Sequence, residues 1–494
     1  MINSLSDFWL KNQKIIFLFL FFFSLVAIFL NPSLDPDFGW HFRNGQIIVA
    51  EGRFPKGDEF SWTMPGYERA YNYWITEAGF YLLESHNLYW FLIVIFGLIS
   101  ASSIYFAVSL GTKSASLLAK IFVGIYCAIL LTTFSGVRPQ VVSFLFFSFL
   151  WVILISGFWK RRVALILVPV MFIAWANFHY AFILGLFFLI LYLALEGVRY
   201  FLLELKLWPA FLNRTKITKP QLLNLGWICF FSFLATFLNP YKFLTYKTIF
   251  EDFLSQTTRQ NIAEWLPLNF ASLFGFLLLC YLALVVVFLA RSFKKVNFSI
   301  SCLWLLSLML ALVSIRHLPF LLIASSSLLV FLWPKKIPNL LRQSFWSAFG
   351  QSFFVLFALI LIIFQLFNFL RVDTSAESLA KSGFYPVGAV SFLLENKIDG
   401  KLFNSYRWGG YLDWQLPKTK VFIDGRMSGW KKDDGIFRDY LTISSLGENT
   451  LPLLDKWQVS LVLVEKDAPL SLLLEKTCWQ KIYEDQATVV FKRN

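Results

Sequence analysis

The amino-acid sequence predicts a polytopic α-helical membrane protein with a small α/β domain at its C-terminal end. Three observations support this fold class. Of the 494 residues, 57% are hydrophobic and only 15% are charged, whereas soluble proteins carry roughly 25% charged residues. Long apolar stretches recur along residues 15–370, and residues 373–494 contain none. Most of the chain is therefore expected to lie in lipid, with one globular domain after the last membrane helix.

Hydropathy predicts about eleven membrane helices, because each apolar stretch approaches the length that crosses a bilayer. The stretches cover residues 15–34, 88–110, 117–135, 140–158, 163–178, 180–198, 223–239, 271–290, 298–314, 318–333 and 351–370. The first one follows Lys11 and Lys14, as the apolar core of a signal peptide would. Residues 29–32 lack a cleavage pattern of small residues, so a retained anchor is expected.

The charge distribution predicts the orientation of the chain. If the N-terminus is cytoplasmic, the segments on that side hold 18 of the 28 basic residues before position 373 and three acidic residues. The opposite side receives ten basic and eleven acidic residues. This bias follows the positive-inside rule, and an odd number of spans then places the C-terminal domain outside the cytoplasm. The transmembrane domain is predicted to cover residues 1–372, and the extracytoplasmic domain residues 373–494.

Residues 373–494 are predicted to form the small α/β domain. They hold 16 basic and 16 acidic residues, so the net charge of +14 belongs to the membrane part. Because topology explains that charge, no nucleic-acid partner is expected. The predicted elements are a helix over Val387–Asn396 and strands over Lys420–Asp424, Val459–Val464 and Ala487–Phe491, with turns at Ser382-Gly383, Asp399-Gly400 and Gly409-Gly410.

The first predicted external loop, residues 31–87, is far longer than a connection between adjacent helices requires. Asp35 and Pro36 fit the N-cap and the first position of a helix that runs to about Ala50. A second amphipathic stretch, Tyr71–Leu83, is expected to lie along the membrane surface. The loop is therefore predicted to be a structured part of the protein.

Two carboxylates and an imidazole follow the first membrane helix closely: Asp35, Asp37 and His41. On one interpretation the aspartates only cap the new helix and complement its dipole. On the other they supply a general base, ligands for Mg²⁺ or Mn²⁺, or both, next to the lipid headgroups. His41 lies on the same helix face as Asp37, and it is either part of that site or an interfacial imidazole hydrogen-bonded to the loop.

Three tight external turns are predicted to place polar side chains at one depth of the membrane. The turns are residues 136–140, 175–179 and 314–319, and their polar residues include Arg138, Asn177, His179, Arg316 and His317. Arginine can grip a phosphate through two hydrogen bonds, and polar groups at membrane depth are functional candidates. The alternative is that Arg138 and Arg316 reach the headgroups or pair with acids of the first loop.

The C-terminal domain contributes two further sets of candidates. Asp424-Gly425-Arg426 directly follows a predicted strand, where functional loops are common. An ion pair that stabilises a glycine turn explains the same residues. Trp408 and Tyr411 can stack on a sugar, and aromatic packing against the membrane domain explains them equally well.

Several motifs along the whole chain resemble those of a known superfamily. They are Asp35-Pro-Asp37-x-x-Trp40-His41-x-x-x-Gly45, Gly52-x-x-Pro55-x-x-Asp58-x-Phe60-Ser61-x-Thr63, Trp175-Ala-Asn177-x-His179, Leu238-Asn-Pro-Tyr241, Glu264-Trp265, Asn404-x-Tyr406-x-Trp408-Gly-Gly-Tyr411-Leu-x-Trp414 and Asp424-Gly-Arg426. The chain resembles an uncharacterised branch of bacterial polytopic membrane proteins in the GT-C glycosyltransferase superfamily, related to polyprenyl-phosphate-sugar-dependent mannosyltransferases. The resemblance implies a GT-C-like fold, a polyprenyl-phosphate-linked sugar donor and a catalytic acid in the first external loop. Carried over residue by residue, the resemblance favours Asp37 as this catalytic acid, with Asp35 as the second candidate and Glu77 as a further acid of the loop.

The expected function is therefore transfer of a sugar at the outer face of the bacterial cytoplasmic membrane, from a lipid-linked donor to a glycan, lipid or protein acceptor. Asp37, Asp35, His41 and Glu77 are expected at the catalytic centre, and the polar residues of the three turns at the donor phosphate. Two alternatives stay open: a non-catalytic envelope assembly or binding protein, and a glycan-handling protein of O-antigen ligase or polymerase type. Transport is disfavoured because Glu196 is the only acid within an apolar stretch.

Overall fold

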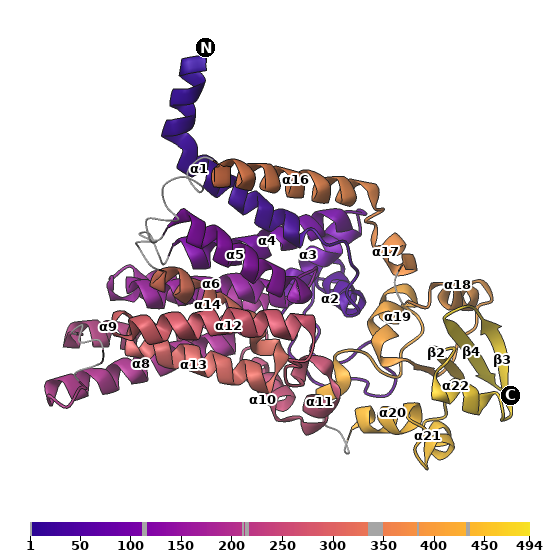
Figure 1. Cartoon of the computed structure of the whole chain (residues 1–494). Coiled ribbons are helices and arrows are strands. Elements are labelled where there is room, and N and C mark those ends of the chain that lie inside the picture. Colours follow the sequence, from indigo (N-terminus) through magenta and orange to yellow (C-terminus); the bar gives the residue numbers. More distant parts are fainter. Residues whose placement is uncertain are drawn as a thin grey trace. The chain divides into compact units, whose positions relative to one another are not determined.

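The computed structural model describes residues 2–110, 116–209, 212, 217–333, 349–382, 385–430 and 435–494. The chain folds into two compact units, each assembled from three separate segments (Figure 1). The helical unit comprises residues 1–32, 93–238 and 266–372, and the mixed unit comprises residues 33–92, 239–265 and 373–494. The first loop thus shares one compact unit with the C-terminal chain.

The helical unit consists of apolar helices. They are α1 (Ile2–Phe29), α4 (Tyr89–Ser109), α5 (Leu117–Leu131), α6 (Gln140–Ser156), α7 (Ala164–Phe178), α8 (Phe182–Glu204), α9 (Lys219–Ala235), α12 (Leu273–Ser292), α13 (Phe298–Val313), α14 (Leu318–Leu332) and α16 (Phe349–Arg371), with the short 3₁₀ turns η1 (Thr132–Phe134), η2 (Phe158–Lys160), η4 (Phe293–Lys295) and η5 (Ile315–His317). Every predicted apolar stretch coincides with one of these helices. A helix satisfies its own backbone hydrogen bonds, which a chain in lipid requires.

Six helical segments of the described chain are long and apolar enough to cross a membrane. They are Tyr89–Ser109, Leu117–Phe134, Phe182–Glu204, Leu273–Ser292, Ile315–Leu332 and Ser352–Arg371. Four shorter apolar helices accompany them: Lys14–Phe29, Gln140–Ser156, Ala164–Phe178 and Phe298–Val313. These helices support the prediction that the chain is a membrane protein. The expected count of eleven spans is not confirmed, and the orientation of the termini stays a prediction.

Helix α14 forms the centre of the helical unit, because nearly all of its residues are buried and it packs on α5, α6, α12 and α13. Its serines are hydrogen-bonded across helices: Trp304 Nε1 donates to Ser325 Oγ at 2.8 Å, and the hydroxyls of Tyr281 and Ser326 lie 2.7 Å apart. Small hydroxyl residues allow helices to approach closely within a membrane and satisfy polar groups there. In another part of the unit, α1 lies along α16 (Figure 1).

The mixed unit combines short helices with a four-stranded sheet. Its helices are α2 (Phe38–Ala50), α3 (Trp74–Glu84), α10 (Phe243–Leu254), α11 (Gln256–Asn261), η3 (Ala263–Trp265), α17 (Ala376–Ser382), α18 (Val387–Glu395), η6 (Tyr406–Trp408), α19 (Gly409–Gln415), η7 (Met427–Gly429), α20 (Ile436–Ser444), α21 (Thr450–Lys456) and α22 (Pro469–Leu474). Its strands are β1 (Leu402–Asn404), β2 (Leu461–Glu465), β3 (Trp479–Glu484) and β4 (Thr488–Arg493). The strand order is β1-β2-β4-β3, with β1 parallel to β2 and the other two pairs antiparallel. Helix α18 packs on β3 and β4, and α22 packs on β2 (Figure 1).

The predicted elements of the C-terminal chain are confirmed in part. The strands expected near residues 459–464 and 487–491 are β2 and β4, and the expected helix is α18. The strand predicted over 420–424 is wrong, because within this segment Val421 alone is bridged, to Ser61. The side chain of Asn404 holds the segment instead: its Nδ2 donates to Ile423 O at 2.8 Å and its Oδ1 accepts from Phe422 N at 2.9 Å.

The first loop extends the fold of the C-terminal chain through backbone pairing. Val421 N donates to Phe60 O at 3.0 Å, and Trp62 N donates to Val421 O at 3.1 Å. Thr63 Oγ1 donates to Phe422 O at 2.7 Å. Buried backbone groups need such partners. Residues 60–63 are therefore an integral part of the mixed unit, which the sequence did not predict.

Two glycines allow α2 to approach its neighbours very closely. A Cβ at Gly39 would lie 1.8 Å from the carbonyl oxygen of Gly410 in α19. A Cβ at Gly45 would lie 2.0 Å from the carbonyl oxygen of Glu77 in α3. The turn predicted at Gly409-Gly410 is wrong, since both residues begin α19. Their glycine identity reflects close packing rather than a turn. In the turn predicted at Asp399-Gly400, the backbone N of Gly400 donates to Asp399 Oδ1. The turn predicted at Ser382-Gly383 cannot be compared, because Gly383 lies outside the described residues.

Gly39→Ala is expected to destabilise the protein by roughly 1–3 kcal/mol, because the added methyl group forces α2 away from α19. Gly79→Ala is the matched control, since a Cβ at this position of α3 meets nothing within 4 Å. The control is expected to be neutral or to stabilise by up to about 1 kcal/mol. Denaturant unfolding of the purified protein in detergent measures both. Equal stability of the two variants would contradict the packing described.

Candidate functional site

A buried arginine stands at the centre of the mixed unit. Arg426 donates from Nε to Asp424 Oδ1 at 2.9 Å and from Nη2 to Asp58 Oδ1 at 2.8 Å. Its Nη1 donates to the hydroxyl of Tyr71 at 3.0 Å. The side chains of Arg426 and Asp58 are 1% and 0% exposed. Arg426 therefore ties two positions of the first loop to the segment that follows Ile423.

The surroundings of Arg426 are aromatic and dry. Its guanidinium carbon lies 4.6 Å from the ring centre of Phe60, 5.3 Å from that of Trp430 and 5.9 Å from that of Trp40. Although burial alone would lower it, the pKa of Arg426 lies well above its ordinary value because Asp424, Tyr71 and Asp58 surround the guanidinium. The arginine is thus a permanent positive charge that these partners stabilise.

This network accounts for Asp424 and Arg426 as the turn-stabilising interpretation expected. Sequence reasoning missed Asp58 and Tyr71. Asp58 also accepts from the backbone of Phe60 and Ser61 at 3.2 and 3.0 Å, which fixes the loop next to it. The motif that contains Asp58, Phe60 and Ser61 could have indicated Asp58, because its carboxylate accepts from the backbone of these two neighbours.

Asp35 and Asp37 lie directly before α2. The helix begins at Phe38, so the predicted start at Pro36 is two residues early, whereas the predicted end at Ala50 is confirmed. Asp37 occupies the N-cap position without a side-chain capping bond, and its Oδ1 accepts from Trp40 Nε1 at 3.0 Å. Asp35 Oδ1 accepts from the backbone N of Asp37 at 2.9 Å. Capping alone therefore does not explain Asp37.

The carboxylate of Asp37 lies against the Asp424-Gly425-Arg426 turn. A Cβ at Gly425 would lie 1.9 Å from Asp37 Oδ1, so this carboxylate packs directly on the glycine. Both Asp35 and Asp37 are partly exposed. The structure thus brings Asp37 of the first loop next to the candidate residues Asp424 and Arg426 of the C-terminal chain.

His41 and Glu77 meet in the interior between α2 and α3. His41 Nδ1 lies 3.0 Å from Glu77 Oε1, and Asn44 Nδ2 donates to the same oxygen at 3.0 Å. Glu77 is fully buried, and its Oε2 has no hydrogen-bond partner among the described residues. Burial raises the pKa of Glu77 well above its ordinary value, while the bond from Asn44 and the charge of Arg426 lower it less. Glu77 and His41 therefore form a buried pair between α2 and α3, and the catalytic role expected of them stays a prediction.

Trp408 and Tyr411 are buried, at 2% and 4% exposure. The ring of Tyr411 lies 5.0 Å from that of Tyr385 and 6.2 Å from that of Trp414. Neither residue offers the exposed ring face that stacking on a sugar requires. Packing inside the mixed unit accounts for both.

In the helical unit, two of the polar turns come together. Trp175 Nε1 donates to Ser143 Oγ at 2.8 Å, and His179 Nδ1 lies 2.8 Å from the same oxygen. The ring of Tyr180 stacks on His179 with centres 4.4 Å apart. The guanidinium of Arg316 lies over the Tyr180 ring at 5.4 Å and donates to its hydroxyl. His179 and Arg316 thus belong to one side-chain cluster.

The remaining turn residues have different surroundings. Asn177 Nδ2 donates to the backbone oxygens of Ile173 and Leu238, each at 2.8 Å, so this side chain anchors two segments. His317 ends the turn η5, and its Nδ1 has no hydrogen-bond partner within the described part of the chain. Arg138 lies in the turn before α6. That Arg138, His179 and Arg316 line a pocket with Asp37 stays a prediction.

The described residues contain no group of three or more histidine, cysteine, aspartate or glutamate side chains that could hold a metal ion. Asp35 and Asp37 remain the predicted metal ligands. Two carboxylates are a sufficient protein contribution for Mg²⁺, which keeps several waters and takes further oxygens from substrate phosphate. The oxygen-only donor set and partial exposure of this pair fit such an ion.

Comparison with protein-family models and with curated protein sequences finds no match for this chain. Comparison with solved structures finds the oligosaccharyltransferase of Archaeoglobus fulgidus in its apo form. The likeness has a TM-score of 0.50 at 11% sequence identity, and it covers 98% of this chain and 75% of that chain. At this identity the likeness shows the fold alone.

The apolar helices and the fold together define the class: a membrane protein with a small C-terminal sheet whose fold is similar to that of an oligosaccharyltransferase. The likeness agrees with the expected fold, whereas membership of the superfamily and of its uncharacterised bacterial branch stays a prediction.

Arg426→Leu is expected to cost about 3–5 kcal/mol of folding free energy, because it leaves the buried Asp58 and Asp424 without their cation. Arg407→Leu is the matched control, since Arg407 makes an exposed ion pair with Glu465 at 2.8 Å. Surface pairs of this kind contribute at most about 1 kcal/mol. Denaturant unfolding in detergent measures both variants, and similar losses would contradict a buried network.

Glu77→Gln is expected to change how stability depends on pH. Because the pKa of Glu77 is raised in the folded protein, its contribution is complete below its unfolded pKa of about 4.3 and is lost as pH rises through the folded pKa. Glutamine stays neutral, so the variant should lose less thermal stability than the wild type as the pH rises from about 4.3 through the folded pKa of Glu77. Melting temperatures across this range test it, with exposed Glu475→Gln as the control. Parallel pH profiles for Glu77→Gln and the wild type would show that the buried carboxyl does not titrate as described.

Proposed function

We propose that this protein is a membrane glycosyltransferase that moves a sugar from a polyprenyl-phosphate-linked donor to an acceptor at the outer face of the cytoplasmic membrane. The observation that carries the proposal is the likeness of nearly the whole fold to an oligosaccharyltransferase. The placement of Asp37 gives it a chemical centre. A partly exposed carboxylate lies where the first loop meets the C-terminal turn.

Asp37 is the proposed catalytic base, and Asp35 is its neighbour in the same site. The bond from Trp40 Nε1 orients one oxygen of Asp37. The position before the first turn of α2 favours negative charge, because the helix dipole is positive there. Both effects favour the ionised carboxylate that a base requires.

The proposed reaction is a direct displacement. Asp37 takes the proton of the acceptor hydroxyl. At the same time the hydroxyl oxygen forms a bond to the anomeric carbon of the donor sugar. The bond between that carbon and the phosphate oxygen breaks, and the phosphate leaves with the electron pair. A single displacement of this kind inverts the anomeric centre.

The leaving phosphate needs positive charge or hydrogen-bond donors. Arg138, Arg316, His317, Asn177 and His179 are the proposed contributors. Arg316 is already oriented by the ring and hydroxyl of Tyr180. A divalent ion held by Asp35 and Asp37 would supply further positive charge next to the phosphate.

Release of polyprenyl phosphate from a lipid donor with a labelled sugar, in membranes that contain the protein, measures the proposed activity. Asp37→Asn keeps the shape of the side chain and removes the base, so the rate is expected to fall at least about a hundredfold. Asp467→Asn is the matched control, because Asp467 is an exposed aspartate of the same unit. The control should keep the wild-type rate.

Full activity of Asp37→Asn would exclude Asp37 as the base. Absence of donor cleavage by the wild type with every polyprenyl-phosphate sugar tested would instead favour an assembly or binding protein. Chelation with EDTA followed by Mg²⁺ or Mn²⁺ addition tests the proposed ion. Loss and recovery of the rate is the expected result.

A further inference from the structure

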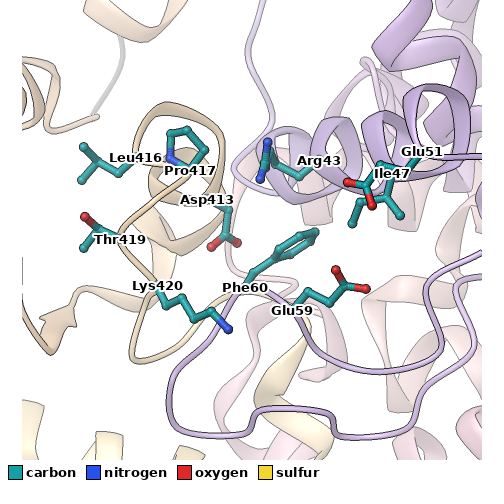
Figure 2. Close-up of a pocket in the computed structure, with 10 residues that line it drawn as sticks. All are labelled: Arg43, Ile47, Glu51, Glu59, Phe60, Asp413, Leu416, Pro417, Thr419 and Lys420. Atoms are coloured by element: carbon teal, nitrogen blue, oxygen red, sulfur yellow. The ribbon is translucent and has the colours of Figure 1, made fainter. Parts of the chain in front are cut away.

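A small pocket of about 80 Å³ lies in the mixed unit between α2, residues 59–60 of the first loop and the chain that follows α19 (Figure 2). None of the predicted catalytic residues lines it. Figure 2 shows the carboxyl of Asp413 and the ammonium end of Lys420 directed into the space beside Phe60. The pocket is therefore a candidate binding site separate from Asp37.

Asp413 is the most informative group of this pocket. It is 4% exposed, and its buried Oδ2 has no hydrogen-bond partner within the described part of the chain. Burial raises its pKa well above the ordinary value, and repulsion from Asp424 adds to the effect. A buried polar group without a partner costs free energy, so an external group that bonds to Asp413 would remove that cost.

Two cations complete the lining. Arg43 extends from α2, and its buried Nε has no hydrogen-bond partner among the residues described, while its Nη1 donates to Gln46. Lys420 lines the opposite side and is exposed. Arg43 and Lys420 therefore present two cationic donors to one small space beside the carboxyl of Asp413, whose raised pKa favours a bound proton.

The two glutamates of the pocket are already paired. Glu59 accepts two bonds from Arg53, at 2.6 and 2.7 Å, and Glu51 accepts one from Arg53 at 2.8 Å. Arg53 therefore offsets one of their two negative charges. The side chains of Ile47, Phe60 and Leu416 form apolar walls, which strengthen electrostatic interactions inside the pocket.

We infer that this pocket binds a terminal anionic oxygen group, a carboxylate or a phosphate, through Arg43, Lys420 and Asp413. The small volume suits one such group rather than a whole sugar, since pockets for larger ligands measure roughly 300 Å³ or more. The inference does not depend on the proposed transfer reaction. Two sources offer this chemistry: a soluble ligand and the headgroup of an anionic lipid.

Thermal unfolding of the purified full-length protein in detergent tests the inference, with D-glucuronate and inorganic phosphate as probes and D-glucose as the neutral comparison. Saturable stabilisation by at least one anion, and none by glucose, is expected. Lys420→Gln should weaken the apparent affinity at least about tenfold, because a charge-assisted bond is lost. Lys418→Gln is the matched control: Lys418 is exposed, lies two residues away and does not line the pocket.

A second arm identifies the source of the anion by comparing discs of phosphatidylcholine with discs that contain phosphatidylglycerol. Stabilisation by phosphatidylglycerol that is lost in Lys420→Gln and kept in Lys418→Gln assigns the pocket to a lipid headgroup. Stabilisation by the soluble anions alone assigns it to a soluble ligand.

The inference is overturned if no anion stabilises the wild type, if glucose stabilises it equally, or if the two lysine variants respond alike. Arg43→Gln provides an independent check from the other side of the pocket. If that variant is unfolded, Lys420→Gln still decides the matter, because Lys420 is exposed and takes no part in the core.

Discussion

The buried charge of Arg426 is the constraint on which the rest of the mixed unit depends. A guanidinium in a dry, aromatic interior is tolerated when carboxylates and hydroxyls surround it. Here Asp424 lies two residues away, whereas Asp58 lies 368 residues away in the first loop. Separating the loop from the C-terminal chain would leave Arg426 with less compensation. The first loop is thus held to the C-terminal chain by electrostatics as well as by the pairing of Phe60 and Trp62 with Val421.

The proposed catalytic base, Asp37, takes its position from the mixed unit. Asp37 lies at the start of α2, and α2 is packed at glycine contacts against α19 and α3. Glu77 and His41 form a buried pair between α2 and α3. Asp37 therefore belongs to a packed helix terminus rather than to a free loop. A catalytic group is effective when its surroundings fix its position before the substrate arrives.

The sequence was sufficient to predict those features whose physical signal is local. Apolar stretches predicted helices, Gly52 predicted the end of α2, and an acid and a base two residues apart predicted the Asp424–Arg426 pair. The sequence was insufficient to predict contacts between residues that are far apart along the chain. Nothing near Asp58 in the sequence indicates an arginine 368 residues later. Gly409 and Gly410 read as a turn because the chain that approaches them, Pro36 and Ile423, is distant in sequence. Asp413 could not be singled out from the sequence, since its pocket is also lined by residues of α2 and the first loop.

The central claim is that the first loop and the C-terminal chain form one cooperative body. Hydrogen–deuterium exchange of the full-length protein in lipid discs tests it most directly, through peptides that cover residues 60–63 and 421–423. Protection of both peptides in the wild type, and loss of protection in both together in Asp58→Asn, is the result expected of one cooperative unit. Rapid exchange of residues 60–63 in the wild type, with residues 421–423 protected, would contradict the account.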